Sequence, residues 1–200
     1  MSNLSSIGRF AFALSLATVP LLASDGNWNF GVGLTYASGL KDVKDFYAGA
    51  YSASTVTLSP VGAAFMSFYE WKNGFRFFED VGPVMVAMGD VRFVDVPVGL
   101  SAGYVLLPSQ DTSPYVRAGI RDHIASGDRV ESSTPGAFAA LGVDFARRSG
   151  MPWGIEAAID TSLVKFKSST QVWNPATDQE EDVFTKIKPN KLLLNVHLIF

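Results

Sequence analysis

Apolar residues alternate with small or polar residues over most of the chain after residue 25. An alternation with a period of two is typical of β-strands, and helical spacing is hard to find beyond that point. The first segment places five large residues on one side: Trp28, Phe30, Val32, Leu34 and Tyr36. The final segment, 192–200, repeats the pattern. The sequence therefore predicts an all-β protein.

Eight segments carry this alternation: 28–36, 56–71, 74–87, 96–104, 116–121, 137–145, 153–160 and 192–200. In the second segment the apolar phase slips at Ser59-Pro60, which indicates a bulge. In the third, Glu79 falls on the apolar side, and the pattern gives no reason for it.

The connections between these segments alternate in length. Short turns rich in Gly, Pro, Ser and Asp are expected at 72–74, 107–114 and 147–152, and longer loops at about 40–54, 88–95, 124–135 and 168–189. A continuous meander of this kind predicts an eight-stranded antiparallel up-and-down transmembrane β-barrel over residues 25–200.

The first 24 residues have the order of a secretory signal peptide. A short polar segment ends at Arg9, a mostly apolar run of 13 residues extends from Phe10 to Leu22, and Ala23-Ser24 lead into a polar stretch. The run is too short for a membrane-spanning helix, which needs about 20 apolar residues. We therefore expect residues 1–24 to be removed on export.

The polarity of the two strand faces favours a membrane barrel. Charged residues make up only 18% of the chain, and the non-apolar face is mostly Gly, Ser, Thr and Asn, which suits the crowded interior of a small barrel. Aromatic residues recur at one end of every strand, as expected at a membrane–water interface. The expected girdle is Trp28, Trp71, Phe75, Tyr104, Phe145, Trp153 and Phe200, with Tyr115 in the inward phase. A soluble periplasmic lipocalin-like binder remains the alternative.

Three stretches resemble the small bacterial OmpA/OmpW-like outer-membrane barrels: Trp28–Gly33, Ser113–Gly119 and the terminal Phe200. The resemblance implies a place in the bacterial outer membrane, with its lipids and lipopolysaccharide as neighbours. It also implies a structural or interaction role, or OmpW-like passage of small hydrophobic molecules. The alternating final strand that ends at Phe200 is similar to the signal read by the barrel-assembly machinery.

Charged residues of both signs occupy inward positions and are expected to pair, because an unpaired buried charge is costly. We expect Arg117 and Arg121 to pair with Asp144, Glu156 or Asp160, and Arg76, Asp80 and Glu70 to join them. Such a network predicts a plug of salt bridges, with a polar conduit or ligand site as the alternative.

Little in the sequence points to catalysis, and we expect no enzyme activity, cofactor, metal or nucleic acid. The chain has no Cys, and His123 and His197 lack metal-ligand spacing. An outer-membrane lipid A acyl hydrolase centred on His123 remains an alternative, with Ser126, Asp122 or Asp128 as partners to test.

The acidic cluster in the last loop is expected to be solvated or to bridge lipopolysaccharide phosphates through divalent cations: Asp178, Glu180, Glu181 and Asp182.

Overall fold

The structure is a computed structural model that describes residues 25–51, 57–88, 91–174 and 178–200. The expected signal peptide, residues 1–24, lies outside the described part of the chain.

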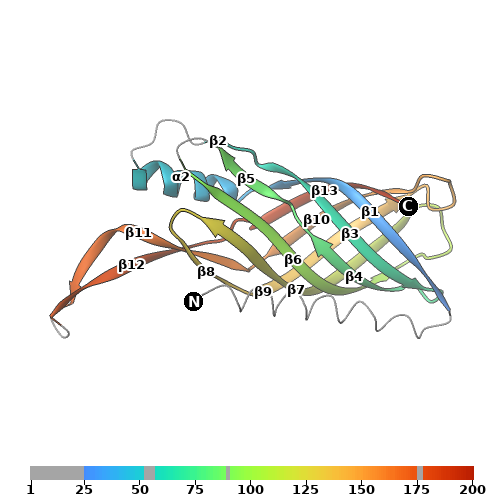
Figure 1. Ribbon diagram of the computed structural model, residues 1–200. Coiled ribbons are helices and arrows are strands. Elements are labelled where there is room, and N and C mark those ends of the chain that lie inside the picture. The colour runs from blue at the N-terminus through green and yellow to red at the C-terminus, as the bar shows by residue number, and fades with distance from the viewer. Residues whose placement is uncertain (1–24, 52–56, 89–90, 175–177) are drawn as a thin grey trace.

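Eight antiparallel strands form a closed barrel, as the sequence predicted (Figure 1). Each strand pairs with its neighbours along the chain, and the last pairs with the first, so no backbone edge is left open. The wall strands are β1 (Gly26–Ala37), β3 (Val61–Trp71), β4 (Phe75–Val81), β6 (Phe93–Val105), β7 (Ser113–Gly127), β9 (Gly136–Phe145), β10 (Trp153–Asp160) and β13 (Leu192–Ile199).

Two short strands extend the wall. The predicted break at Ser59-Pro60 separates β2 (Thr57–Leu58) from β3, and β2 pairs with β5 (Met85–Met88). The predicted strand 74–87 is likewise divided, because β4 ends at Val81 and β5 begins three residues after Gly82. Gly82 has a φ of 111°, a left-handed conformation that favours glycine at this bend.

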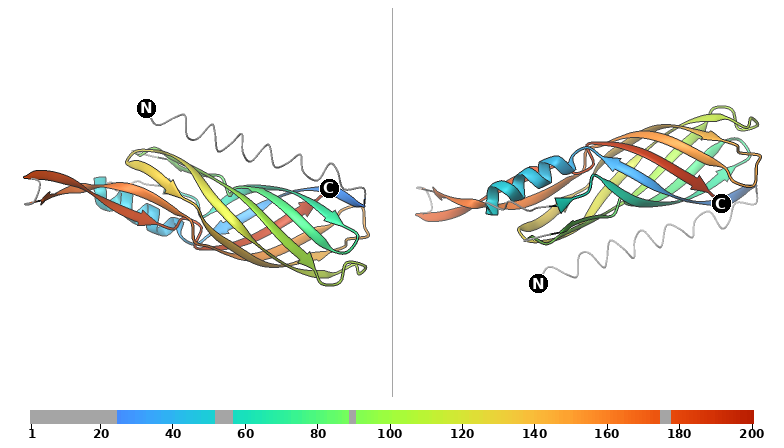
Figure 2. Two further views of the ribbon diagram at one scale, coloured as in Figure 1. Left: turned by 90° about the horizontal axis from the view of Figure 1, so that it is seen from below. Right: turned by 90° about the horizontal axis from the view of Figure 1, so that it is seen from above.

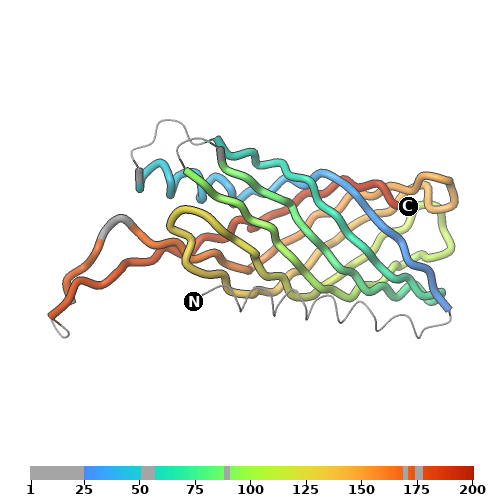
Figure 3. Tube along the Cα trace, viewed as in Figure 1, coloured from blue at the N-terminus to red at the C-terminus, as the bar shows by residue number. Residues whose placement is uncertain are grey.

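The C-terminus and the three short turns lie at one end of the barrel, here called the terminal end. The opposite end is called the distal end, and Figure 3 shows parts of the chain that project beyond the barrel there. Three of the four loops predicted at the distal end are wrong. Residues 124–135 are mostly strand, because β7 continues to Gly127 and β8 (Val130–Thr134) begins three residues later. Residues 40–54 contain the helix α2 (Leu40–Tyr51), and residues 168–189 are mostly strand. Among the described residues, no helix is long and apolar enough to cross a membrane.

A three-stranded sheet projects beyond the distal end, as both views in Figure 2 show. Strands β11 (Leu163–Asn174) and β12 (Gln179–Ile187) continue the neighbouring wall strands β10 and β13 outward, and β8 (Val130–Thr134) pairs with β11. The barrel therefore carries an outer hairpin that the sequence pattern did not predict.

The wall is apolar outside and charged inside. Leu34, Ile120, Leu141 and Ile159 are 58–66% exposed on the outer face, whereas charged side chains on the opposite face of the same strands are buried. A soluble lipocalin-like barrel has the reverse arrangement, with an apolar interior and a charged exterior. The structure therefore contradicts the soluble alternative.

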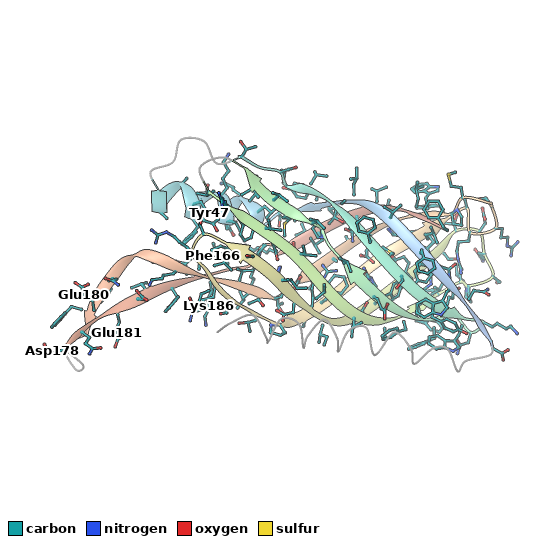
Figure 4. The ribbon with its side chains drawn as sticks, viewed as in Figure 1. Tyr47, Phe166, Asp178, Glu180, Glu181 and Lys186 are labelled. Atoms are coloured by element: carbon teal, nitrogen blue, oxygen red, sulfur yellow. The ribbon has the colours of Figure 1, made fainter. Side chains whose placement is uncertain are left out.

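Apolar residues fill the distal part of the lumen. Leu40, Val43 and Tyr47 recur at i, i+3 and i+7 on α2, and all three are at most 2% exposed. Tyr47 packs on Phe166 of β11, with ring centroids 5.8 Å apart, and both are labelled in Figure 4. Their cluster continues to inward-facing wall residues, so α2 caps the distal end. Each such buried side chain stabilises the fold by roughly 1.5–3 kcal/mol.

Candidate functional site: the charged lumen

Arg117 lies at the centre of the lumen. The alternation of β7 turns it inward, where its Nε and Nη2 donate to the two oxygens of Glu156 at 2.6 and 2.8 Å. Its Nη1 donates to Asp80 Oδ2 at 2.6 Å. A guanidinium that holds one carboxylate through two nitrogens is fixed in both position and orientation.

Glu156 of β10 accepts hydrogen bonds from two other strands, β7 and β13. The Tyr115 hydroxyl donates to it at 2.9 Å, and the Asn195 amide donates at 2.7 Å. Thr35 of β1 in turn donates to Asn195. Glu156 is buried, and each of its two carboxylate oxygens accepts two hydrogen bonds, so the layer joins opposite walls of the barrel.

Aromatic rings close the space around Arg117. Its guanidinium carbon lies 4.7 Å from the ring centroids of both Phe78 and Phe138. The remaining cavity beside Arg117 and Asp80 measures about 20 Å³, which is enough for a single water molecule. At this level the lumen is filled by its own side chains.

Arg121 is held more loosely. Its Nη2 lies 3.8 Å from Asp80 and its Nη1 lies 3.8 Å from Asp160, while its guanidinium stacks 4.1 Å from the Phe138 ring. The structure therefore brings Arg117 together with Glu156 and Arg121 together with Asp160, as the sequence indicated.

Asp144 lies in a second cluster, at the terminal end. It is 2.6 Å from Arg76 Nη2 and 3.9 Å from His197 Nε2, so its expected pairing with Arg117 or Arg121 is not observed. Arg76 also donates to Glu70 at 2.8 Å, and Glu70 pairs with Arg147. These groups line a polar cavity of about 390 Å³.

His123 lies in a third buried cluster, nearer the distal end. Its Nδ1 is 2.7 Å from Asp95 Oδ2, and its Nε2 is 2.8 Å from Ser162 Oγ. The Ser162 hydroxyl also lies 2.6 Å from Asp160 Oδ1. The partners considered from the sequence were therefore wrong. Asp122 and Ser126 stand opposite Val98 and Val94 of β6 in the strand register. The Asp128 carboxylate accepts a hydrogen bond from the Arg92 backbone N–H.

This cluster has the order of a Ser–His–Asp triad but is sealed. Ser162, His123 and Asp95 are each at most 3% exposed. A Ser hydroxyl that donates to Asp160 does not donate to the imidazole, and this competes with the proton transfer that nucleophilic catalysis requires. Strands β6 and β7 and the segment between β10 and β11 supply the three residues, and no local spacing connects them in the sequence.

The aromatic residues of the expected girdle lie together at the terminal end. Phe75 is paired with Tyr104, and Trp153 with Phe145, in the strand register. Ring contacts link Trp28 to Trp71 through Tyr69, and Phe145 stacks on Trp153 at 4.4 Å. Phe200 is 66% exposed at the same end, whereas Tyr115 is buried in the lumen.

Glu79 has a partner on the outer face of the wall. Ser67 stands opposite it in the register and donates to Glu79 Oε2 at 3.1 Å. This hydrogen bond satisfies one oxygen of the carboxyl group, whereas the other, Oε1, is buried without a hydrogen-bond partner among the described residues.

The acidic residues of the outer hairpin do not form a metal site. Asp182 pairs with Lys167 at 2.7 Å and accepts from Gln171 at 3.0 Å. Figure 4 labels Asp178, Glu180 and Glu181 at the far tip. Within the described residues, no group of three or more His, Asp or Glu side chains could hold a metal ion.

Two solved structures share this architecture. The outer membrane protein OprG from Pseudomonas aeruginosa has a TM-score of 0.54 and 9% sequence identity, over 88% of this chain and 95% of its own. Neisserial surface protein A (NspA) has a TM-score of 0.47 and 12% identity, over 88% and 97%. No protein-family model and no curated protein sequence matches the chain. The chain has the fold of a small eight-stranded outer-membrane β-barrel.

Proposed function

We propose that this protein is a closed outer-membrane barrel that acts through the structures at its distal end. The observation that carries the proposal is the Arg117–Glu156 layer, which leaves a cavity of only about 20 Å³ at its level of the lumen. A buried pair of this kind is costly to break. The interior therefore supports the barrel, and the outer hairpin and α2 are left to make contacts.

This proposal places the terminal end in the periplasm and the distal end outside the cell. Short turns on one side and longer projections on the other are the usual arrangement in outer-membrane barrels. Export through a signal peptide at residues 1–24 forms part of the same proposal.

Cysteine labelling on intact cells tests the orientation. The chain has no Cys, so Glu180→Cys at the hairpin tip and Lys72→Cys at a short turn each introduce one thiol. A membrane-impermeant maleimide is expected to label the first in intact cells and the second only after permeabilisation. The opposite pattern would overturn the proposed orientation.

Passage of small hydrophobic molecules, which the resemblance to OmpW-like proteins implies, is less well supported. It requires an opening through the charged layer or the apolar cap. Planar-bilayer recordings are expected to show no steady conductance for the wild type. Steady channels in the wild type whose conductance changes in Arg117→Ala would instead support a conduit through the lumen.

A hydrolase is the second candidate, and the Asp95–His123–Ser162 geometry is the one observation that favours it. An active-site fluorophosphonate probe distinguishes the two functions. We expect the wild-type protein in detergent or in vesicles to remain unlabelled, because Ser162 is 1% exposed. Labelling that is lost in both Ser162→Ala and His123→Ala would establish the hydrolase.

We also propose that the final strand directs assembly of the barrel. Phe200 is exposed, and its backbone exchanges hydrogen bonds with Phe30 at 2.8 and 3.0 Å, where the last strand meets the first. Deletion of Phe200 is expected to reduce the folded, heat-modifiable form in membranes several-fold. Trp173→Ala, at the outer hairpin, serves as the control and is expected to leave this amount unchanged.

A further inference from the structure

The lysines of this chain gather at one level of the molecule. Of the eight in the sequence, only Lys72 lies outside three short segments at the distal end. The other seven define what we call the lysine collar: Lys41 and Lys44 on α2, Lys165 and Lys167 on β11, and Lys186, Lys188 and Lys191 at and after the end of β12. The whole chain carries a formal charge of −3, so this concentration of cations is local.

The collar begins where the apolar wall ends. Leu192 follows Lys191 directly and is 41% exposed on the outer face, opposite Ile159, which is 58% exposed. Ser38, at the end of β1, exchanges hydrogen bonds with Leu192 at 3.0 and 3.1 Å. Lys191 therefore stands at the boundary between the hydrocarbon-facing wall and the projecting structures.

The lysines of β12 and the following turn line a groove. It measures about 600 Å³ and lies between this segment and α2, which contributes Asp42, Asp45 and Phe46. Lys186, labelled in Figure 4, Lys188 and Lys191 are all exposed there. The start of α2 packs so closely on the backbone of Lys188 that a side chain at Gly39 would overlap its carbonyl oxygen. The turn that carries the cations is thus held in place.

The three lysine charges that line this groove are only partly offset by the two carboxylates that line it, those of Asp42 and Asp45. Lys165 and Lys186 stand directly opposite each other in the register of β11 and β12, an arrangement of like charges that is unfavourable without an anion. Lys165 turns its Nζ over the Phe184 ring, 3.7 Å from the centroid. Within the described ranges, no ion pair is found for Lys186, Lys188 or Lys191, whereas Lys167 is paired with Asp182.

We propose that the groove of the lysine collar binds the phosphate groups of lipids in the outer leaflet of the membrane. An ammonium group is a compact point charge suited to phosphate. The position at the end of the apolar wall favours a lipid headgroup over a soluble anion, because the acyl chains of such a lipid would lie along Leu192 and Ile159. Asp178, Glu180 and Glu181 lie at the far tip of the hairpin, farther from the barrel than Lys186 (Figure 4).

Asp42 and Asp45 line the same groove and limit how many phosphates it holds. The seven lysines face five acidic residues on α2 and β12: Asp42, Asp45, Glu180, Glu181 and Asp182. These segments therefore keep a surplus of two positive charges. A lysine next to an anionic surface contributes about 1 kcal/mol, or about fivefold in affinity. This inference rests on the proposed orientation of the barrel for its biological meaning, but its test does not.

Native mass spectrometry of the folded full-length barrel in detergent, titrated with bisphosphorylated lipid A, measures the binding. The variant Lys186→Gln/Lys188→Gln/Lys191→Gln is expected to lose at least tenfold in affinity. Lys72→Gln, at the terminal end, is the matched control and is expected to stay within twofold of the wild type. Retained heat-modifiability on gels confirms that the variants are folded.

Lipid A without its phosphates, and inorganic phosphate alone, complete the experiment. Wild-type protein is expected to bind the dephosphorylated lipid as weakly as the triple variant binds the intact lipid, and to bind inorganic phosphate at least 100-fold more weakly. Equal affinity of the triple variant and the wild type for lipid A would overturn the proposal. Equally tight binding of inorganic phosphate would identify a site for free anions instead. Because the measurement uses isolated protein, its failure is separable from failure of the cysteine-labelling test of orientation.

Discussion

Two carboxylates, one in the lumen and one on the outer hairpin, show how differently the same interaction acts in the two regions. Glu156 contacts Arg117 at 2.6 Å with both partners at most 1% exposed, whereas Asp182 contacts Lys167 at 2.7 Å with its side chain 32% exposed. A buried charge that loses its partner is left in a poorly solvated site, while an exposed one is rehydrated. The lumen therefore depends on its pairs, and the hairpin does not.

The largest effect is expected for Glu156→Ala. Arg117 would keep Asp80 but lose its bidentate partner, and Tyr115 and Asn195 would lose their acceptor. Breaking a buried pair in this way costs about 3–5 kcal/mol. Urea unfolding in lipid vesicles, followed by tryptophan fluorescence, measures the change.

Glu180→Gln, at the tip of the outer hairpin, is the control for this experiment and is expected to leave the free energy of unfolding unchanged. A cost below 1 kcal/mol for Glu156→Ala would show that the lumen charges are not coupled to stability, and the contrast between the two regions would disappear.

The next effect concerns the apolar cap. Phe166→Ala removes a ring that packs on Phe46, Tyr47 and Phe93 at 4.9–5.8 Å. The loss is about 3 kcal/mol. It is expected to appear as faster hydrogen exchange in α2 and β11, with β10 and β13 unchanged. Faster exchange along the whole wall would show that the cap and the barrel unfold as one unit.

A smaller effect is expected when the hairpin is shortened. Replacing residues 168–183 with Asn-Gly would join Lys167 to Phe184, which are paired in the register. The wall strands keep all their partners, so the free energy of unfolding should change by no more than about 0.5 kcal/mol. A loss of several kcal/mol would make the hairpin part of the folding unit.

The smallest effect is the pH response of the hairpin. Hydrogen bonds from Gln171 and Lys167 hold the pKa of Asp182 below its ordinary value. A carboxylate with a lowered pKa stabilises the folded form at neutral pH, and that contribution is lost as the pH falls through the acid range. Hydrogen exchange in β11 and β12 should therefore be more protected at pH 6 than at pH 3, after correction for the intrinsic rate. Asp182→Asn should remove the difference.

The wall and the lumen charges were predictable because both follow from a period of two. That pattern turns Arg117, Glu156 and Asp160 inward and Leu141 outward without any knowledge of pairing. Partners between strands were not predictable in the same way. Asp95, His123 and Ser162 meet only because β6, β7 and the segment after β10 are brought together by the closed sheet.

The distal end was missed for a different reason. Leu40, Val43 and Tyr47 carry a helical spacing, but only three apolar positions support it, and charged neighbours gave residues 40–54 the composition of a loop. In β11 and β12 the alternation is carried by Lys, Thr and Glu as well as by apolar residues, as expected for a sheet that projects beyond the apolar wall. Hydrophobic periodicity is a weak signal in the outer part of the hairpin, residues 171–173 and 179–181, where both faces are exposed.

Spin-label accessibility at two exposed apolar sites tests the central claim most directly. Leu141 on the wall is 66% exposed and Trp173 on the hairpin is 55% exposed, so exposure alone does not distinguish them. With nitroxide labels at Leu141→Cys and Trp173→Cys in vesicles, the account predicts that oxygen reaches the first and a water-soluble nickel chelate reaches only the second. Equal access of the nickel chelate to both labels would show that the wall faces water and would contradict the account.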